Sequence, residues 1–231
     1  MWSGPRNVST AMMYSWRQRS DTLVIDEPWY AHYLMHTGVE HPDPDAVIAS
    51  QPVDPTYVVE GLLASSSRPI RFLKNMAHHL VGLDPSILDL SDNCLLVRDP
   101  RDMLPSLMAG LGRVPTIDET GLGYQVAMFD RMAAVGAPPP VIVTSSLLRD
   151  PTRVLTALCG ELGIEFDPAS LSWPAGPKPE DGVWARHWYA SVHETTGFAP
   201  YEAKPGRIEP ELIDLLERCE PLYERLVATS L

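Results

Sequence analysis

The sequence has few cysteines, few lysines and no long apolar run, and each scarcity excludes a class of protein. The three cysteines, Cys94, Cys159 and Cys219, form no CxxC pair. This odd, scattered set predicts no disulfide framework, favours a reducing compartment and indicates buried apolar cysteines. No apolar run approaches the roughly 20 residues of a membrane span, and the polar N-terminus does not resemble a signal peptide. We therefore expect a cytoplasmic protein with no membrane partner.

Positive charge is also scarce, since the formal net charge is −12. That balance argues against a nucleic-acid partner, which requires a basic face. Only three of the 18 cationic residues are lysine, so arginine supplies most of the positive charge. Arginine makes planar, bidentate contacts with phosphate and sulfate, and the places where it occurs therefore indicate candidate anion sites. The length of 231 residues predicts one domain, residues 1–231, that buries its own core.

Short apolar, β-rich runs alternate with helix-like stretches along the chain. The expected strands are the residues before Gly4 and residues 22–27, 70–75, 93–99 and 140–145. The expected helices are residues 9–19, 56–65, 100–112, 122–135 and 151–162. This alternation predicts an α/β fold, a three-layer sandwich with a central parallel sheet of the P-loop-like kind and a helical cap.

The C-terminal part of the chain has a different composition. Residues 172–182 are rich in proline and glycine and predict a loop. The last stretch, from residue 209, has the pattern of an amphipathic helix, and we expect Pro221 to interrupt or kink it.

The segment GPRNVST, residues 4–10, lies between the first expected strand and the first expected helix. A Walker A loop reads G-x-x-x-x-G-K-[ST]; here Gly4, Ser9 and Thr10 hold similar places, but the final Gly-Lys pair is absent. Backbone N–H groups and the positive end of a helix dipole would still converge there. With the fork of Arg6 they predict a phosphate or sulfate site. The alternative is that Ser9 only caps the helix and Arg6 is a solvated charge.

A second candidate anion site lies in VRDPRDMLPS, where Arg98 ends an expected strand and Ser106 follows eight residues later in a helix. The two side chains can converge at the carboxyl edge of the sheet, where ligands bind in such folds. The alternative is a surface ion pair, Arg98 with Asp102 or Asp99 with Arg101. Two anion sites on neighbouring strand ends favour a ligand with two separated anionic groups.

These two motifs resemble those of the sulfotransferase superfamily, whose members use 3′-phosphoadenosine 5′-phosphosulfate as the donor. The resemblance assigns the 5′-phosphosulfate to Arg6, Asn7, Ser9 and Thr10, and the 3′-phosphate to Arg98 and Ser106. The chain departs from many cytosolic members by lacking the loop lysine that steadies the bridging oxygen. Arg6 or another residue must therefore take that role.

Sulfuryl transfer to an alcohol also needs a base for the acceptor hydroxyl and stabilisation of the transferring charge. Glu27 follows the second expected strand, at a spacing similar to that of the acidic base in a sugar-sulfating branch of the superfamily. The alternative is that Glu27 only favours a helix N-terminus beside Pro28.

Lys74, His78 and His79 follow the third expected strand and resemble the lysine and catalytic histidine of the cytosolic branch, although at a wider spacing. Lys74 is the candidate stabiliser of transferring charge. His78 and His79 rank close behind Glu27 as the base, and a purely structural role for the histidines is the alternative.

The late segment KPEDGVWARHWY resembles the stretch that closes over the donor 3′-phosphate in the superfamily. Its candidates are Lys178, Trp184 and Arg186, with tryptophan packing as the alternative. The aromatic residues Trp29, Tyr30 and Tyr33 are candidates for the wall of an acceptor pocket, with burial in the core as the alternative.

The resemblance implies an enzyme that moves a sulfuryl group from 3′-phosphoadenosine 5′-phosphosulfate to a hydroxyl of a small molecule. One alternative is a P-loop small-molecule kinase, because LVIDE imitates a Walker B strand and offers Asp26 or Glu27 to magnesium. Another is a non-catalytic nucleotide-binding protein. We expect no metal, since the seven histidines do not stand at ligand spacing with cysteine or acidic partners.

Overall fold

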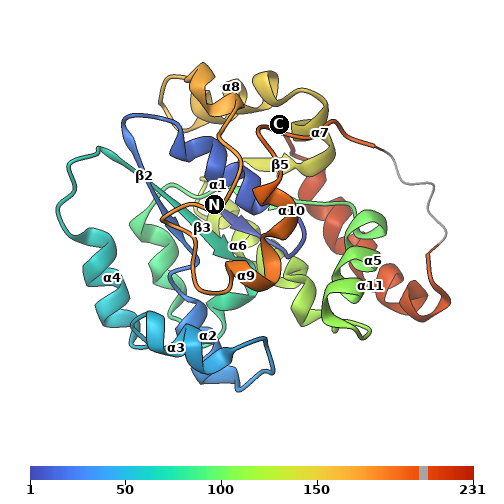
Figure 1. The fold of residues 1–231 in the computed structure, drawn as a ribbon. Coiled ribbons are helices and arrows are strands. Elements are labelled where there is room, and N and C mark those ends of the chain that lie inside the picture. The colour runs from blue at the N-terminus through green and yellow to red at the C-terminus, as the bar shows by residue number, and fades with distance from the viewer. Residues whose placement is uncertain (203–207) are drawn as a thin grey trace.

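Five short strands form one parallel sheet in the computed structural model, which describes residues 1–202 and 208–231 (Figure 1). The strands are β1 (Trp2–Ser3), β2 (Thr22–Asp26), β3 (Ile70–Met76), β4 (Leu95–Val97) and β5 (Val141–Val143). Their order is β2-β3-β1-β4-β5, so the first strand of the chain lies at the centre. The connection from β1 runs to β2 on one side, whereas the connection from β3 crosses to β4 on the other, so the direction reverses beside β1 and a crevice opens there at the carboxyl ends of the strands.

Eleven α-helices are found among the described residues. They are α1 (Ser9–Arg17), α2 (Tyr30–Thr37), α3 (Pro44–Ser50), α4 (Pro55–Leu63), α5 (Pro100–Leu111), α6 (Leu122–Ala134), α7 (Thr144–Arg149), α8 (Pro151–Glu161), α9 (Ala185–Trp188), α10 (Ala190–His193) and α11 (Ile213–Val227). Short 3-10 turns include η1 (Ala77–Leu80) and η3 (Asp118–Thr120). Three helices, α4, α5 and α8, begin at an Asp-Pro pair whose aspartate accepts a hydrogen bond from a first-turn N–H. The proline loses no intrahelical bond there, which explains these starts.

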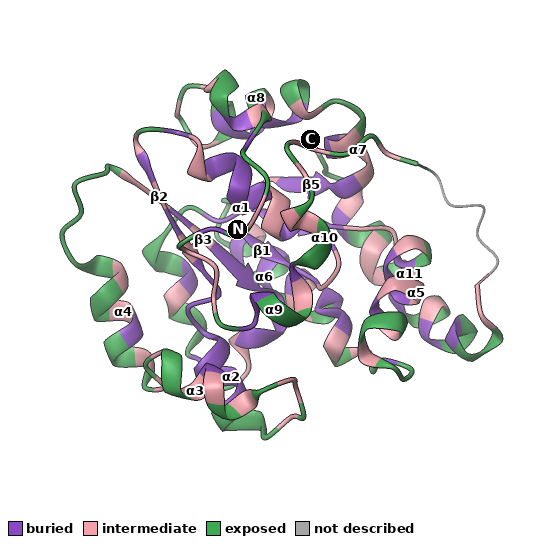
Figure 2. Cartoon of the chain, in the orientation of Figure 1, coloured by how far each residue is buried: buried purple, intermediate pink, exposed green. Residues whose placement is uncertain are grey.

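Side chains of β4 and β5 alternate between two apolar clusters. Leu95, Val97 and Val141 pack with α5, α6 and α11 on one face of the sheet. Leu96 and Ile142 pack with α1 and α8 on the other face. Burial is concentrated in these layers (Figure 2), and the three-layer α/β sandwich with a central parallel sheet is confirmed.

A third cluster joins α2 and α3 to the region of α9 and forms the cap, with α4 beside it (Figure 1). The composition of residues 30–50 gave no helix prediction, because α2 and α3 span only eight and seven residues and neither has a side-chain cap. The expected interruption at Pro221 is wrong. One helix, α11, runs through it, and its buried face of Leu215, Cys219 and Leu226 packs on the sheet layer.

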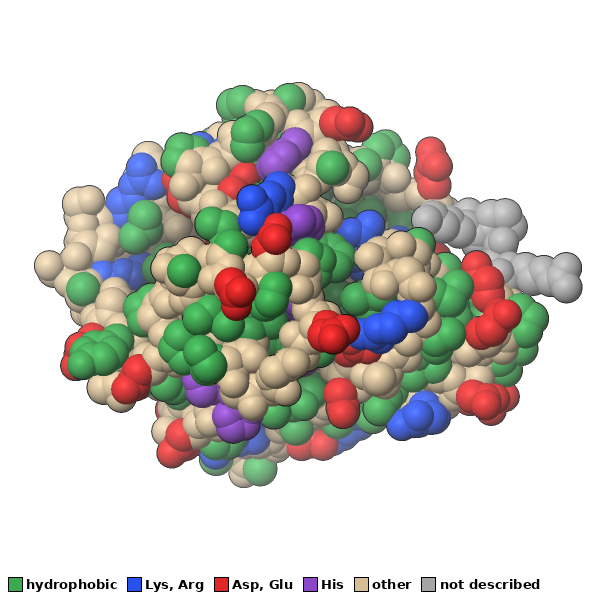
Figure 3. All heavy atoms as spheres, turned by 60° about the horizontal axis from the view of Figure 1, so that its bottom comes forward, with side chains coloured by type: hydrophobic (Ala, Val, Ile, Leu, Met, Phe, Trp, Pro, Cys, Tyr) green, Lys and Arg blue, Asp and Glu red, His purple; other side chains and the backbone are tan. Residues whose placement is uncertain are grey.

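All three cysteines are free and buried, as expected. Over residues 1–202 and 208–231, no helix combines the length and the apolar character needed to cross a bilayer. Figure 3 shows acidic and basic side chains scattered among apolar ones on the face that carries the cap, rather than a continuous basic surface.

Candidate active site

A cavity of about 330 Å³ lies at the carboxyl edge of the sheet. Residues from both predicted anion motifs and from the ends of β2 and β3 line it together. The predicted site residues in this lining are Arg6, Asn7, Ser9, Thr10, Glu27, Lys74, His78, His79, Arg98 and Ser106. The fold therefore gathers nearly all of the sequence-predicted candidates in one pocket.

The opening loop is held in an unusual backbone conformation. Arg6 and Val8 have φ values of 60° and 57°, in the left-handed region. The Asn7 amide donates to the Leu96 carbonyl at 3.0 Å, and Thr144 Oγ1 donates to the Asn7 carbonyl at 3.2 Å, so the loop is tied to β4 and α7. Strained backbone of this kind persists where surrounding contacts impose it, and it clusters at ligand sites.

The N-terminus of α1 faces the cavity. Its first intrahelical bond runs from the Met12 N–H to the Val8 carbonyl. The N–H groups of residues 9–11 therefore have no carbonyl within the helix, and all three residues line the cavity. Unpaired N–H groups together with the helix dipole make an anion site.

Arg98 and Ser106 meet the same loop from the other side. Arg6 Nε donates to Ser106 Oγ at 2.9 Å, and Arg98 Nη1 donates to the Arg6 carbonyl at 2.6 Å. The buried Arg98 Nε has no hydrogen-bond partner, and burial lowers the pKa of this guanidinium. Arg98 makes no ion pair with any described residue, so the surface-pair alternative is not seen. A half-buried guanidinium without a counter-ion is suited to an anionic ligand.

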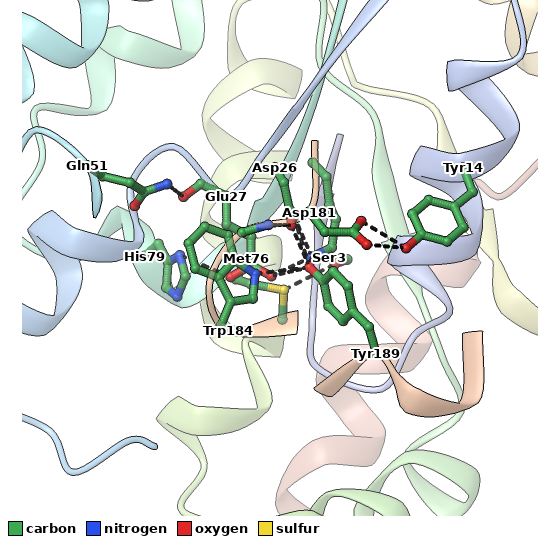
Figure 4. Close-up of polar contacts among 12 residues, drawn as sticks. Ser3, Tyr14, Asp26, Glu27, Gln51, Met76, His79, Asp181, Trp184 and Tyr189 are labelled. Carbon is green, nitrogen blue, oxygen red and sulfur yellow. Dashed lines mark hydrogen bonds and ion pairs between the residues drawn. The ribbon is translucent and has the colours of Figure 1, made fainter. Parts of the chain in front are cut away.

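Beside the anion loop lies a buried ionic cluster (Figure 4). Lys74 Nζ donates to Asp26 Oδ1 at 3.0 Å, to Tyr189 Oη at 2.5 Å and to Glu27 Oε1. Lys74 is only 1% exposed, and these three contacts use all three of its N–H donors. Lys74 therefore lines the cavity without an N–H donor free to meet a ligand.

Glu27 projects from the end of β2 with a strained backbone, at a φ of 42°. Its N–H donates to the Lys74 carbonyl at 2.8 Å, and Gln51 Nε2 donates to its carbonyl at 3.0 Å, which fixes this conformation. Burial raises the pKa of the Glu27 carboxyl, and the negative charge of Asp26 raises it further. The positive charge of Lys74 acts in the opposite direction, but the pKa remains raised. For Lys74, burial acts to lower the pKa, but Asp26 and Glu27 together outweigh it, and the pKa is raised.

The two histidines lie in an aromatic surround. The His79 ring stacks between Tyr30 and Tyr33, with centroids 4.7 Å from each, and the His78 ring packs edge-on to His79. Both Nδ1 atoms are buried without partners, and His79 Nδ1 lies 4.0 Å from Glu27 Oε2. Burial lowers the pKa of His78 to about 3 and holds the pKa of His79 well below its usual value. Both imidazoles are therefore neutral and weakly basic.

Residues 172–199, which we call the strap, cross over this edge of the sheet and are fastened by aspartates. The Gly182 N–H donates to Asp26 Oδ2 at 3.2 Å, and Asp181 accepts hydrogen bonds from the Tyr14 hydroxyl at 2.7 and 2.8 Å. The strap supplies an aromatic and apolar part of the cavity wall that the sequence did not reveal. These lining residues are Trp188, Tyr189, Val192 and Phe198.

The strap candidates predicted to contact the donor lie elsewhere. Lys178 is not in the cavity lining, because its Nζ donates to the Pro174 carbonyl at 2.7 Å and to the Gly176 carbonyl. Arg186 pairs with Asp43 at 2.7 Å on the surface. Trp184 is buried and donates to the Tyr189 hydroxyl at 3.0 Å.

The aromatic candidates for the acceptor wall also differ in position. Tyr30 lines the cavity, Tyr33 lies behind His79, and Trp29 belongs to the core. Among the described residues, no group of three or more His, Cys, Asp or Glu side chains is arranged to hold a metal ion.

Together these features define an α/β protein with an anion-binding pocket at the carboxyl edge of a parallel sheet. Residues 1–230 match the profile of the Sulfotransferase domain family. The chain belongs to this family, and the resemblance carried by the two anion motifs is confirmed at that level.

Solved structures agree on the fold. One is the sulfotransferase domain of the Synechococcus PCC 7002 olefin synthase, with a TM-score of 0.53 and 18% identity, covering 94% of this chain and 92% of that one. Another is a sulfotransferase from Alicyclobacillus acidocaldarius, with a TM-score of 0.55 and 12% identity. The match covers 98% of this chain and 94% of that one.

Two curated relatives from Arabidopsis thaliana are more similar in sequence. They are the branched-chain-amino-acid aminotransferase-like proteins 1 and 2, which are 40% and 37% identical over 227 residues. The match takes in 97% of this chain but only 40% of each relative, so the chain spans less than half of their length.

Proposed function

We propose that this protein is a sulfotransferase that uses 3′-phosphoadenosine 5′-phosphosulfate as donor and a hydroxyl of a small molecule as acceptor. One observation carries the proposal. The opening loop, the Arg98–Ser106 pair and the carboxylate of Glu27 line a single cavity. Anion binding and a proton acceptor are thereby combined at one place, as sulfuryl transfer requires.

The residues of the pocket fit a donor with two anionic groups. The N–H groups of residues 9–11 and the Arg6 side chain would hold the 5′-phosphosulfate, with Asn7 fixing the loop. Arg98 and Ser106 would hold the 3′-phosphate, which would give the unpartnered Arg98 Nε its counter-ion. Arg6 is also our candidate for the role of the absent loop lysine.

The bound donor would supply the sulfuryl group, whose bond to the phosphate oxygen breaks, with the electron pair leaving on that oxygen, as the acceptor oxygen bonds to sulfur. Glu27 is our candidate for the base that takes the acceptor proton on Oε2, the oxygen that Lys74 does not hold. Lys74 would keep Glu27 in place rather than touch the sulfuryl group. The raised pKa of Glu27 makes it a stronger base than an ordinary carboxylate.

The strap suggests the kind of acceptor. Trp188, Val192 and Phe198 give the cavity an apolar wall near Glu27 and Tyr30. A small molecule with an apolar or aromatic body and a hydroxyl would be accommodated there.

The three free, buried cysteines are compatible with a cytoplasmic location, which we retain in the proposal.

The buried ionic cluster weighs against the kinase alternative. Magnesium would need the carboxylates of Asp26 or Glu27, and both accept hydrogen bonds from Lys74. A cation bound there would be repelled by the buried ammonium.

The test is a thermal-shift comparison of 3′-phosphoadenosine 5′-phosphate, AMP and ATP with magnesium, followed by transfer of labelled sulfate from the donor. We expect the bisphosphate to raise the melting temperature most. Arg98→Ala should weaken its binding by about 1.5–3 kcal/mol, the range for a charged hydrogen bond. Arg101→Ala is the matched control, since Arg101 lies nearby in the first turn of α5 but pairs with Glu220 at the surface. Larger shifts with ATP that grow with magnesium would instead support a kinase.

A further inference from the structure

The Tyr189 hydroxyl lies between the two buried carboxylates of Asp26 and Glu27. It accepts hydrogen bonds from Lys74 Nζ at 2.5 Å and from Trp184 Nε1 at 3.0 Å. It lies 2.8 and 3.0 Å from the two oxygens of Asp26 but 3.5 Å from Glu27 Oε1. A tyrosine has one proton to donate, and these distances assign that proton to Asp26.

This arrangement resolves a competition between the carboxylates. Asp26 and Glu27 are both buried, and the single ammonium of Lys74 lies between them. A buried carboxylate needs hydrogen bonds to remain ionised. Asp26 obtains additional ones from Tyr189 and from the Gly182 N–H, both of which belong to the strap. Lys74 is then able to hold Glu27 as well.

We propose that Tyr189 is a positioning residue for Glu27: its hydroxyl gives Asp26 a hydrogen bond of its own, so the Lys74 ammonium is shared between Asp26 and Glu27 Oε1, and Glu27 Oε2 is left to face the acceptor. This inference rests on the proposed function, in which Glu27 is the base. It gives the strap a part in the reaction, because the strap brings the hydroxyl to the ends of β2 and β3.

Four other titratable groups lie around Glu27, and of these only Lys74 carries a positive charge. They are Tyr30 on α2, His79 on η1, Asp26 on β2 and Lys74 on β3. Burial raises the pKa of Tyr30 above its usual range and lowers the pKa of His79, so both rings stay neutral. Burial also raises the pKa of Tyr189, and the negative charges of Asp26 and Glu27 raise it further. The Tyr189 hydroxyl therefore keeps its proton. Among the described residues, Lys74 is thus the cation that pairs with Glu27.

The test is the pH dependence of kcat/KM in Tyr189→Phe. Without the hydroxyl, Asp26 loses the hydrogen bond from Tyr189, and the Lys74 N–H that met Tyr189 loses its acceptor. We expect this N–H to turn to Asp26 and to draw the ammonium away from Glu27, so the carboxylate of Glu27 becomes harder to form. The acid limb of the profile should move to higher pH by about one unit, which corresponds to a hydrogen bond of about 1.4 kcal/mol. A merely structural role would lower the rate without moving this limb.

Asp26→Asn should move the limb the other way. It removes the competing carboxylate, so Lys74 serves Glu27 alone and the limb should fall to lower pH. Tyr14→Phe is the matched control, since it removes a tyrosine hydroxyl that contacts Asp181 on the same strap but does not touch Lys74 or Glu27 (Figure 4). The limb of this control should stay in place.

A second readout needs neither donor nor acceptor. The infrared carboxyl band of protonated Glu27, identified by its loss in Glu27→Gln, should titrate at higher pH in Tyr189→Phe and at lower pH in Asp26→Asn. If this midpoint shifts but the wild-type protein transfers no sulfuryl group, the positioning is upheld and the proposed function fails. If transfer occurs but neither limb nor midpoint moves, the positioning role is overturned. If Tyr189→Phe does not fold, an unmoved midpoint in Asp26→Asn overturns it.

Discussion

Arg6 donates a hydrogen bond from Nε to the Ser106 hydroxyl at 2.9 Å, although the two residues are 100 positions apart in the chain. Arg98 closes the same contact by donating to the Arg6 carbonyl. The two anion motifs, which the sequence shows separately, are therefore one continuous surface in the folded protein. A phosphate arriving at Ser106 would meet the guanidinium of Arg6 as well as that of Arg98.

The first prediction concerns the base. Glu27→Gln should lower single-turnover sulfuryl transfer by roughly 10²- to 10⁴-fold, the range for loss of a general base. His78→Asn and His79→Asn should retain most of the rate, because burial leaves both imidazoles weakly basic. Donor binding is measured in parallel by the thermal shift. A near-normal rate in Glu27→Gln, with loss of the reaction in either histidine variant, would reverse the assignment.

The second prediction concerns acid stability. Burial lowers the pKa of His78 from 6.5 to about 3 in the folded protein. Below pH 6.5, His78 binds a proton in the unfolded chain but remains unprotonated in the folded protein. The free energy of unfolding therefore falls as the pH drops from 6.5 toward about 3. This group alone should account for up to about 1.4 kcal/mol per pH unit within that window.

Denaturant unfolding between pH 6.5 and about pH 5 measures this slope. His78→Asn should flatten it, even if the variant is less stable at neutral pH. His36→Asn is measured alongside as the matched control, because it makes the same substitution at an exposed histidine. Equal slopes in wild type and His78→Asn would contradict the prediction.

The third prediction concerns the close packing beneath the opening loop. A Cβ on Gly4 would lie 2.6 Å from the Thr120 carbonyl oxygen, a backbone atom that cannot turn aside. Gly4→Ala should therefore destabilise the protein by about 1–3 kcal/mol and weaken the donor-induced thermal shift. Gly61→Ala in α4 is the matched control, with open space around the new Cβ, and it should be neutral or stabilising by up to about 1 kcal/mol. Equal stability of the two variants would show that the loop tolerates displacement.

The sequence predicted the sheet and the anion motifs because their signals are local. Residues 4–10 are contiguous, and Arg98 and Ser106 lie close in the chain, one just before α5 and the other within it. The predicted ends of the strands were less accurate. The expected strand at residues 93–99 is only Leu95–Val97, because Asp99 turns away to cap α5.

The contacts of the strap could not be predicted from local sequence patterns. Tyr189 lies 163 residues from Asp26, and nothing in the pattern VWARHWY shows which of its aromatic side chains turns inward. The same limit applied to Lys178, whose ammonium is satisfied by carbonyls of its own loop. Lys74 was identified as a site residue, but only the folded arrangement reveals that its N–H donors are already occupied.

The buried ionic cluster also limits how this site can change by mutation. Replacing Lys74 with a neutral residue would leave Asp26 and Glu27 as two buried carboxylates with no cation, at a cost of several kcal/mol. Replacing Asp26 and Lys74 together would remove one charge of each sign and leave Glu27 alone. Among natural sequences of the family, we therefore expect residues 26 and 74 to change together. Glu27 should remain without Lys74 only where another hydrogen-bond donor has replaced the ammonium.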